Sequence, residues 1–535
     1  MISWVSSVMT ENKENKDNLT AEIVLSVIFV ILPVLLSFIE NLINWISTGQ
    51  FAFPGIKWND EAAYYKLIEL YSEYLSPKGY WGFNCEHAIL GTGSAWNFAI
   101  IAPYALIAKI FPMNYSFVFF CNIFFAGVAN GLFLLLTKPE YRTKIKLIAA
   151  EASSVVFLLY INTNMSEIYR FSLAIVIAGL LYKVIFDDKC PVWLKYIVTP
   201  LLILYSMQVY TFFAFVVPIY VLAIMKKGKI GLRVLIAFVA TAITGGGSYV
   251  LLHFISSNYN IGKTEKLLGF LKSGQFFSAF RSFLGMVLDG ARGLFDLRYY
   301  IYANPMYIFH VLFAALIVIL GVKIISDENA SKKDRTIGMI VIYSVVVFFF
   351  MYMTLYTIVP DTFVRGTEIV IVFSLLLLAV TDDKYLAWLL IACNAVSLIF
   401  LPKNLASFAG EERYYTTEAN EEWQELEYKF YDIFHEPYEG MERGEWDYTV
   451  LMYTMEPKVI CAIPDKMGIN FALKNEYFGS DPMYVVFTKH RDLREDYVEH
   501  NLYEFVSKYG NEFFDDYFNA YEDDEYVIFE RITFK

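Results

Sequence analysis

The sequence predicts a polytopic α-helical membrane protein with about eleven membrane-spanning helices, further helices in the membrane interface, and a small C-terminal α/β domain. Two observations about composition lead to this class. Hydrophobic residues make up 57% of the 535 residues and charged residues only 18%, whereas soluble proteins carry about a quarter charged residues. Aromatic residues reach 18%, as is typical of membrane spans and their interfacial belts. This composition excludes a disordered chain, a collagen-like chain and an ordinary cytosolic enzyme.

The third observation is an uneven distribution of charge. Residues 402–535 contain 13 Lys and Arg but 30 Asp and Glu, a balance of −17, so the rest of the chain carries +5 of the total of −12. We therefore divide the chain into a cytoplasmic segment at 1–20, a membrane module at 21–401 and an acidic extracytoplasmic tail at 402–535. The tail is not a nucleic-acid binder, because such proteins need clustered positive charge.

Nine apolar runs are candidate membrane spans, since a helix needs about 20 apolar residues to cross the hydrocarbon layer. They are residues 21–46, 115–137, 147–163, 167–186, 234–255, 305–325, 336–358, 367–380 and 385–401. The first run is too long for the core of a signal peptide, so we interpret it as an uncleaved span. Residues 196–225 are too many for one upright helix, and we expect them to cross twice with a turn near Gln208.

Basic loops set the orientation, because Lys and Arg gather on the cytoplasmic side of membrane proteins. Loops 138–146, 226–233 and 332–335 each hold several of them. All three are cytoplasmic only if residues 97–111, a short apolar segment with Pro103, lie in the interface and do not span. The N-terminus is then cytoplasmic and the C-terminal domain lies outside the cell membrane.

Three long segments share the outer face in this topology: the loops 47–114 and 256–304, and the tail. Long loops are where function concentrates. In residues 278–295 apolar side chains recur with the helical period, and Arg281 and Arg292 fall on the opposite side. This pattern predicts a helix that lies on the membrane surface.

The tail combines strand and helix patterns. We expect strands at 449–453, 484–488 and 526–531 and a helix at 494–509, with 411–427 as a linker or first helix. These elements predict a small domain that folds by itself. No loop carries the spacing of Asp, Asn and Gly that binds calcium, so we expect the domain to fold without a divalent metal ion.

The sequence contains no motif for a metal ion, a nucleotide or a cofactor. Its five cysteines form no CxxC pair, which gives no indication of a disulfide framework or a zinc site. A P-loop, a GxGxxG after a strand and an HExxH motif are missing as well. An ATP-driven pump and a soluble nucleotide-sugar enzyme are therefore disfavoured.

The most informative stretch follows the first span and contains two adjacent acids, Asp60 and Glu61, among aromatic residues. A carboxylate at the outer membrane surface can take a proton from a hydroxyl acceptor that attacks a membrane-anchored donor. The alternative is a solvated helix N-terminus. In that case Asn59 or Asp60 caps the helix, and Glu61 is a first-turn carboxylate favoured by the helix dipole.

The order of motifs in this loop resembles the first external loop of GT-C glycosyltransferases, the polytopic enzymes that use polyprenyl-phosphate sugars. The motifs are Asp60-Glu61-Ala62-Ala63-Tyr64, Gly82-Phe83-Asn84-Cys85-Glu86 and Pro103-Tyr104-Ala105-Leu106-Ile107-Ala108-Lys109-Ile110-Phe111. The resemblance extends over residues 58–137. It points to bacterial members of the group that includes dolichyl-phosphate-mannose mannosyltransferases and aminoarabinose transferases. The His-Pro-Pro sequence that several families carry after the acids is missing, which leaves the substrate subclass open.

The resemblance implies roles for individual residues in the loop. The acid nearest the first span is usually the base in this family, which points to Asp60, with Glu61 as the second candidate. Tyr64, Asn84 and Glu86 are then candidate substrate ligands. Asn84 is equally well explained as a residue that closes a turn.

Arg365 and Lys109 are candidate ligands of the donor phosphate. GT-C proteins often place an arginine in a late external loop or at the start of the next helix, and a guanidinium suits phosphate because it binds two oxygens at once. Alternatively, Arg365 extends to the interface or pairs with a neighbouring acid. Glu167 and Arg170 stand three positions apart, and we interpret them as a plain salt bridge.

The sequence thus favours an inverting membrane glycosyltransferase in which Asp60 deprotonates an acceptor hydroxyl while polyprenyl phosphate leaves. The acceptor would be a cell-envelope polysaccharide, a glycolipid or a protein, and no metal ion or cofactor is expected. One alternative is a transporter or flippase for lipid-linked glycans, which would need polar residues deep in several spans. Another is a membrane sensor in which the tail binds a glycan.

Overall fold

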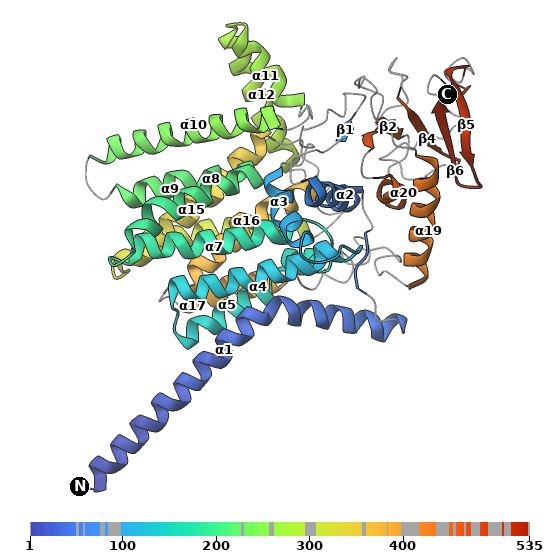
Figure 1. The fold of residues 1–535 in the computed structure, drawn as a ribbon. Coiled ribbons are helices and arrows are strands. Elements are labelled where there is room, and N and C mark those ends of the chain that lie inside the picture. The colour runs from blue at the N-terminus through green and yellow to red at the C-terminus, as the bar shows by residue number, and fades with distance from the viewer. Residues whose placement is uncertain are drawn as a thin grey trace.

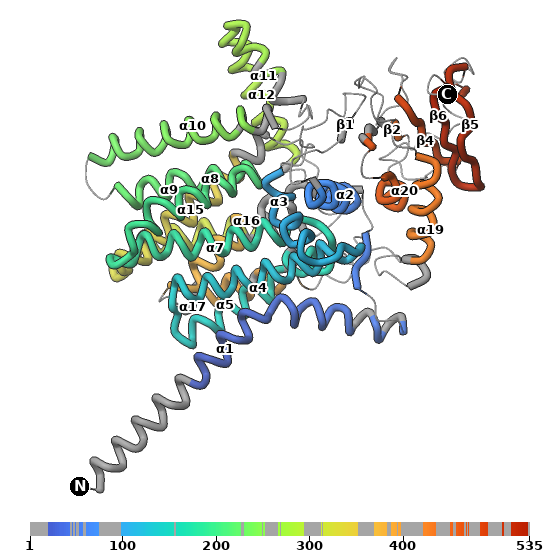
Figure 2. Tube along the Cα trace, in the orientation of Figure 1, coloured from blue at the N-terminus to red at the C-terminus, as the bar shows by residue number. Residues whose placement is uncertain are grey.

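A computed structural model describes most of the membrane module and the central part of the tail. The described residues are 2–49, 53–56, 59–74, 81–83, 98–225, 229–255, 262–294, 306–355, 360–381, 384–396, 398, 417–434, 449–452, 456–464, 467–471, 482–489, 506–507 and 515–532. Figure 1 shows a bundle of helices with a sheet beyond one end, which we call the tail-side end. Figure 2 follows the same chain as a tube.

The first helix, α1, extends over Ile2–Thr48 and contains Pro33. It changes direction part-way along (Figure 1). Proline is a common cause of such bends, because it lacks the N–H that a helix interior requires. The segment Thr20–Leu42 is apolar and long enough to cross a membrane, in agreement with the predicted first span.

The other helices of the bundle overlap the predicted spans. They are α4 (Phe117–Thr137), α5 (Tyr141–Ala152), α6 (Val155–Ile161), α7 (Glu167–Phe186), α10 (Ile230–Ile255), α14 (Met306–Ser326), α15 (Lys332–Leu355), α16 (Pro360–Ala379) and α17 (Lys384–Val396). The predicted span 147–163 is divided between two helices, α5 and α6, by a break at Ser153 and Ser154. Within the described residues, four segments are long and apolar enough to cross a membrane: Thr20–Leu42, α4, α7 and Ile230–Ser248 of α10. The chain is therefore a membrane protein with several apolar helices, while a total of about eleven crossings remains a prediction.

The run 196–225 forms two short helical segments. The first joins η1 (Leu194–Val198), a π-helical turn, to α8 (Thr199–Val209), and the second joins the 3₁₀ turn η2 (Thr211–Phe215) to α9 (Val216–Ile224). Tyr210 between them has an extended backbone. The Tyr220 hydroxyl donates to the Lys195 carbonyl at 2.8 Å, so the two ends of the run lie together. The chain therefore turns back on itself at Tyr210, close to the predicted turn.

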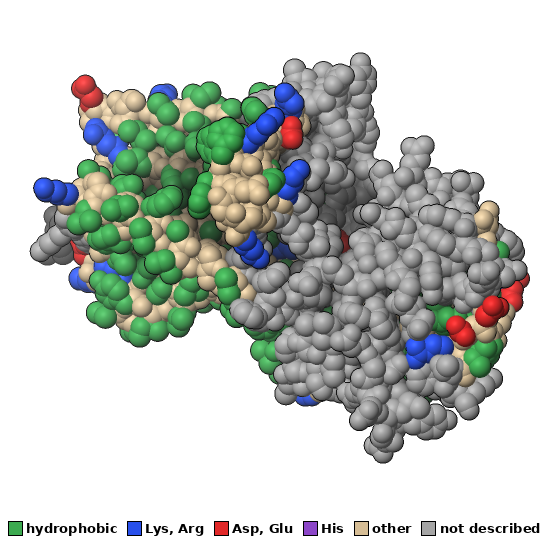
Figure 3. Space-filling model, turned by 90° about the horizontal axis from the view of Figure 1, so that it is seen from above, with side chains coloured by type: hydrophobic (Ala, Val, Ile, Leu, Met, Phe, Trp, Pro, Cys, Tyr) green, Lys and Arg blue, Asp and Glu red, His purple; other side chains and the backbone are tan. Residues whose placement is uncertain are grey.

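The outside of the bundle is apolar. Seen from above, hydrophobic side chains spread over its surface (Figure 3). Phe124, Leu135 and Phe238 are 58%, 70% and 70% exposed, respectively. Soluble proteins rarely expose apolar patches of this extent, and such a surface fits contact with lipid.

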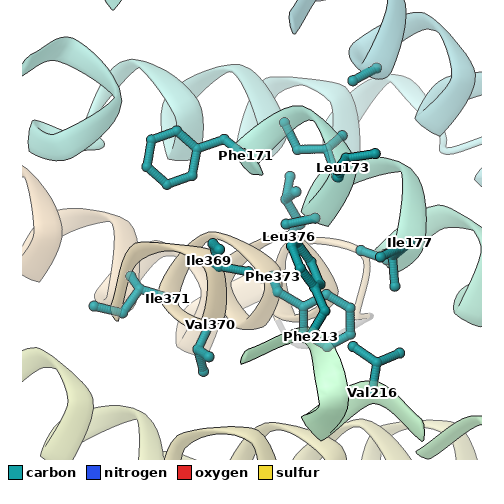
Figure 4. Close-up of a cluster of buried hydrophobic side chains, with 14 of the residues drawn as sticks. Phe171, Leu173, Ile177, Phe213, Val216, Ile369, Val370, Ile371, Phe373 and Leu376 are labelled. Atoms are coloured by element: carbon teal, nitrogen blue, oxygen red, sulfur yellow. The ribbon is translucent and has the colours of Figure 1, made fainter. Parts of the chain in front are cut away.

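The centre of the bundle is formed by α7, η2, α9 and α16. Figure 4 shows Phe171 and Ile177 of α7 among Phe213, Phe373 and Leu376, and all five side chains are buried. In lipid, close packing holds helices together in place of the exclusion of water. Interlocking aromatic and branched side chains are therefore what fixes these helices against one another.

The basic loops lie together at the end of the bundle opposite the tail. Lys144 donates to the carbonyl of Glu22 in α1 at 3.1 Å, and Lys146 donates to the carbonyl of Thr381 after α16 at 3.3 Å. Lys333 at the start of α15 lies over the ring of a tyrosine near the end of α7. The basic loops and the tail are thus separated by the bundle, which is the relation that the predicted orientation requires.

The tail-side sheet has the strand order β1-β3-β2-β4-β6-β5. The strands are β1 (Trp81–Phe83), β2 (Thr449–Met452), β3 (Gly468–Phe471), β4 (Tyr484–Thr488), β5 (Tyr517–Glu522) and β6 (Tyr526–Arg531). The pairs from β1 to β4 are parallel, and β4-β6 and β6-β5 are antiparallel. β2, β4 and β6 match the predicted strands, whereas β3 and β5 are not predicted. The expected helix 494–509 lies outside the described residues apart from 506–507.

The strand β1 comes from the first outer loop and not from the tail. It pairs with β3 from Trp81 opposite Ile469 to Phe83 opposite Phe471. The helix α2 (Asn59–Tyr74) of the same loop also shares a buried core with α19 (Thr417–Ile433) and α20 (Pro457–Ala462) of the tail. A boundary at residue 402 therefore separates two segments that share one sheet and one core.

Because of this shared core, we expect the tail to need the first outer loop for full stability. A fragment of residues 402–535 leaves one edge of β3 unpaired and exposes the side chains that pack against α2. It should melt at a lower temperature, and less cooperatively, than the same fragment joined by a flexible linker to residues 53–83. Equal melting curves would show that the tail folds by itself, and calcium should change neither curve.

A labelling experiment checks the orientation. In a variant without the native cysteines, a cysteine in place of Glu425, which is exposed on α19, should react with a membrane-impermeant maleimide in intact cells. A cysteine in place of Lys332, exposed at the opposite end, should react only after permeabilisation. The reverse pattern would overturn the predicted orientation.

Two helices occupy the segments expected in the interface: α3 (Phe98–Ala108) and α12 (Phe276–Leu294), which follows α11 (Gly262–Lys272). α3 packs against α2 and α8, and its Ile100 and Tyr104 are buried. The opposite side of the helix is partly open, with Leu106 60% exposed, so the predicted interfacial position of α3 stays a prediction. α12 buries Met286 but exposes Phe277 and Phe280 to 81% and 58%, as expected for a helix that rests on lipid.

Candidate active site at the tail-side end of the bundle

Asp60 and Glu61 lie in the first turn of α2. The positive end of the helix dipole is located here and favours carboxylates. Asp60 is partly exposed, whereas Glu61 is only 1% exposed. Of these two neighbouring acids, Asp60 is therefore the one that a substrate can reach.

The Glu61 carboxylate is engaged with the protein interior. Its Oε1 accepts a hydrogen bond from the main-chain N–H of Asn164 at 2.7 Å. Asn164 belongs to the turn between α6 and α7 and is 103 positions away from Glu61 in the sequence. This contact explains the burial of Glu61, because a buried carboxylate is stable only with hydrogen-bond partners.

The turn of residues 162–166, which we call the Asn164 turn, is held by buried side chains from two other helices. Its main-chain groups have no regular helical partners and need others. Asn122 of α4 donates to the carbonyls of Thr163 at 3.3 Å and Met165 at 2.7 Å. Ser37 of α1 donates to Oδ1 of Asn162 at 2.5 Å. The turn is therefore a fixed platform beneath the first turn of α2.

Arg170 reaches from α7 to α2 one turn beyond Asp60. Its guanidinium Nη2 donates to the Tyr64 hydroxyl at 3.4 Å and to Oγ of Ser166 at 3.3 Å. Burial raises the pKa of Tyr64 to about 12, so this hydroxyl stays protonated at neutral pH. Arg170 thus contacts the helix that carries Asp60, one turn farther along.

Glu167 and Arg170 form the predicted salt bridge, with 3.6 Å between Nη1 and Oε1. Glu167 is 2% exposed and the Arg170 side chain 12%. The guanidinium also lies over the Tyr210 ring, 4.7 Å from its centroid, and such stacking on an aromatic face is typical of arginine. The i,i+3 spacing predicts the salt bridge but not the contact with Tyr64. Residues 162–167 are mostly polar although an apolar span follows them. This polar stretch is the sequence signal that could have indicated a contact between the start of α7 and the first outer loop.

Lys109 lies at the other end of α2. Its Nζ donates to the carbonyls of Ser72 at 2.9 Å and Glu73 at 3.5 Å, which satisfies groups that the helix end leaves unpaired. At 1.5 Å per residue, Ser72 is about 18 Å along the helix from Asp60. In this position Lys109 stabilises the end of α2 opposite to Asp60.

The other predicted site residues are described only in part. Asn84 and Glu86 lie outside the described residues. Arg365 is in the second turn of α16, and only its main chain is described. Because α16 ends near Lys146 at the opposite end, it begins at the tail-side end, together with α2.

No group of three or more His, Cys, Asp and Glu side chains among the described residues could hold a metal ion. Glu61 and Glu167 are engaged by the Asn164 main chain and by Arg170, respectively. The described residues at this end thus include a partly exposed carboxylate, Asp60, and a mostly buried guanidinium, Arg170, that contacts the next turn of the same helix.

The fold is similar to that of a known enzyme, although the sequence matches no known family. No protein-family model and no curated protein matches the sequence. The crystal structure of the oligosaccharyltransferase of Archaeoglobus fulgidus in complex with Zn and sulfate is similar over 95% of this chain and 73% of that one, with a TM-score of 0.50 and 14% identity. The apo form of the same enzyme gives a TM-score of 0.47 and 12% identity over 88% and 69% of the two chains.

At this level of identity the similarity concerns the fold alone. The archaeal oligosaccharyltransferase is a member of the GT-C superfamily. The fold of this chain is thus similar to that of a GT-C enzyme, which agrees with the resemblance of the motifs in the first outer loop. The similarity does not single out the bacterial subgroup.

Proposed function

We propose that the protein is a membrane glycosyltransferase that moves a sugar from a polyprenyl-phosphate donor to an acceptor at the outer face of a bacterial cell membrane. The observation that carries this proposal is the partly exposed carboxylate of Asp60 at the tail-side end of a GT-C-type fold. The apolar helices provide a surface for the polyprenyl chain, so the sugar would be presented at the end of the bundle where Asp60 lies.

In the proposed reaction, Asp60 accepts the proton of the acceptor hydroxyl. The hydroxyl oxygen forms a bond to the anomeric carbon as the bond between that carbon and the phosphate oxygen breaks. The polyprenyl phosphate leaves with the electron pair, and the configuration at the anomeric carbon is inverted. The chain's part in this step is to hold one proton acceptor on the acceptor side and positive charge on the phosphate side.

Arg170 is the described cation that best fits the phosphate side. Its guanidinium is mostly buried, stacked on Tyr210 and in contact with Tyr64 on α2. Arg365, in the second turn of α16 at the same end of the bundle, is proposed as a second phosphate ligand. Lys109 is retained only as a weaker proposal, because its amine is bound to the end of α2.

The acceptor would approach through the first outer loop. Tyr64, Asn84 and Glu86 are proposed as ligands of the acceptor on the grounds of their motifs. The tail shares its sheet and core with this loop. We therefore propose that the tail supports the acceptor side of the site, and that the acceptor is a glycan, a glycolipid or a protein of the cell envelope.

The kind of sugar donor that the protein uses is a test of the proposed transferase activity. The purified protein in liposomes should release polyprenyl phosphate from a polyprenyl-phosphate sugar when envelope material is added, and it should not consume a nucleotide sugar. A flippase would move the labelled donor across the bilayer and leave the bond between sugar and phosphate intact. Movement without bond cleavage would thus refute the transferase and support the flippase.

A further inference from the structure

We propose that Asn164 is a positioning residue for Asp60. Glu61 is not a base in this proposal but the anchor through which Asn164 holds the first turn of α2. This inference rests on the proposed function of Asp60. It concerns how the chain holds the base in place, and it assigns a role to a turn whose Asn164 is 103 positions away from Glu61 in the sequence.

The side chain of Asn164 ties together two segments next to α2. Its Nδ2 donates to the carbonyls of Gly55 at 2.9 Å and Pro54 at 3.2 Å, on the segment that precedes α2. Its Oδ1 accepts from the main-chain N–H of Phe119 in the first turn of α4 at 3.0 Å. The residue is 1% exposed, so every one of these bonds is made in the interior.

The main chain of the same residue provides the second anchor, the 2.7 Å hydrogen bond to Glu61. In sequence Asp60 lies between the two anchored points, Gly55 before it and Glu61 after it. Asn164 thus fixes both sides of the segment that carries the base. A shift of about 1 Å in a catalytic group can cost about 100-fold in rate, so this anchoring is expected to matter for turnover.

The ordinary explanation of such a residue is the satisfaction of buried polar groups, which nearly every protein requires. Under that explanation Asn164 variants lose stability, and any loss of activity follows the loss of folded protein. Positioning predicts in addition a loss of kcat that depends on Asp60 being present. The two explanations therefore differ in a measurable coupling between Asn164 and Asp60.

Substitutions at Glu61 separate positioning from proton transfer. Glu61→Gln keeps an oxygen that can accept the N–H of Asn164, whereas Glu61→Ala removes it. If Glu61 is an anchor, Gln should cost about threefold or less and Ala about 10-fold or more in kcat. If Glu61 is the base, both variants should be equally inactive, because neither can take a proton.

The experiment measures kcat, donor KM and melting temperature for Asn164→Ala, Glu61→Gln and Glu61→Ala in the full-length protein, each with Asp60 and with Asp60→Asn. Asn130→Ala is the matched control. Asn130 is likewise a fully buried asparagine that donates to a main-chain carbonyl, that of Phe29, and to Glu151, but it lies in the second half of α4 and bonds no residue of α2.

We expect Asn164→Ala to lower kcat about 10- to 100-fold with Asp60 present, with little change in donor KM, and to have little further effect in the Asp60→Asn background. Asn130→Ala should lower the melting temperature but not kcat per folded molecule. Equal effects of Asn164→Ala in both backgrounds, or an unchanged kcat, would overturn the inference. If Asn164→Ala fails to fold, the comparison of Glu61→Gln with Glu61→Ala decides by itself.

Failure of the proposed function gives a different pattern. Normal turnover in Asp60→Asn would remove the base assignment, whatever the Asn164 variants do. A strong loss in Asp60→Asn together with additive effects of Asn164→Ala would leave the function intact and refute only the positioning role.

Discussion

Asp60→Asn is expected to lower turnover by about 100-fold or more, as the loss of a general base usually does. The amide has nearly the size of the carboxylate and keeps most of its hydrogen bonds, but it cannot accept the acceptor's proton. Folding should change little, because the side chain is partly exposed at the helix N-terminus. The measurement is kcat in a transfer assay with matched amounts of folded protein.

The neighbouring acid provides the control for this prediction. Glu61→Gln removes an equal charge from the same helical turn, and the effect of the helix dipole on the two positions is similar. Near-normal activity in Asp60→Asn alongside an inactive Glu61→Gln would move the base by one residue. Normal activity in both variants would exclude a base in this loop and would favour the transporter.

Arg170→Gln is expected to raise the donor KM by about 10- to 100-fold, the range for losing a hydrogen bond to a charged group. The acceptor KM should change much less, because the guanidinium is proposed to face the phosphate. Arg170→Lys should show an intermediate effect: it keeps the charge beside Glu167 but loses the planar fork that binds two oxygens and stacks on Tyr210.

A second arginine provides the comparison for Arg170. Arg292 on α12 also pairs with an acid three positions away, Asp289, at 3.7 Å, but its side chain is 81% exposed. Arg292→Gln removes the same charge and the same type of ion pair, so its donor KM should stay within about twofold of the unmodified protein. Equal increases in both variants would reflect general electrostatic attraction of the donor, and an unchanged KM in Arg170→Gln would exclude a phosphate role.

Much of the fold is predictable because hydrophobicity along the chain is a local property. The apolar runs become α1, α4, α7 and α10, and the strand patterns at 449–453, 484–488 and 526–531 become β2, β4 and β6. The turn within 196–225 also follows from length, since about 30 residues exceed one crossing. The packing of α3 against α2 could not be predicted, because contact with a neighbouring helix leaves no mark on its own apolar sequence.

The origin of β1 shows the same limit. Three residues of the first outer loop, Trp81–Phe83, complete a sheet made from strands almost 400 residues later. A strand of this length has too few positions to show alternation. Pairing with β3 decides its conformation, and this pairing exists only once the loop and the tail have come together.

By itself, the sequence determined that this is a membrane protein with an acidic tail, and it identified Asp60 and Glu61 as the pair of interest through their motif beyond the first span. The tertiary structure decided which of the two acids is accessible, since it buries Glu61 against Asn164 and leaves Asp60 partly exposed. It also brought Arg170 to Tyr64 across 106 positions of the chain. The physical reason is that composition and periodicity depend on neighbouring residues, whereas the environment of a carboxylate or a guanidinium depends on which distant groups the packing of helices brings beside it.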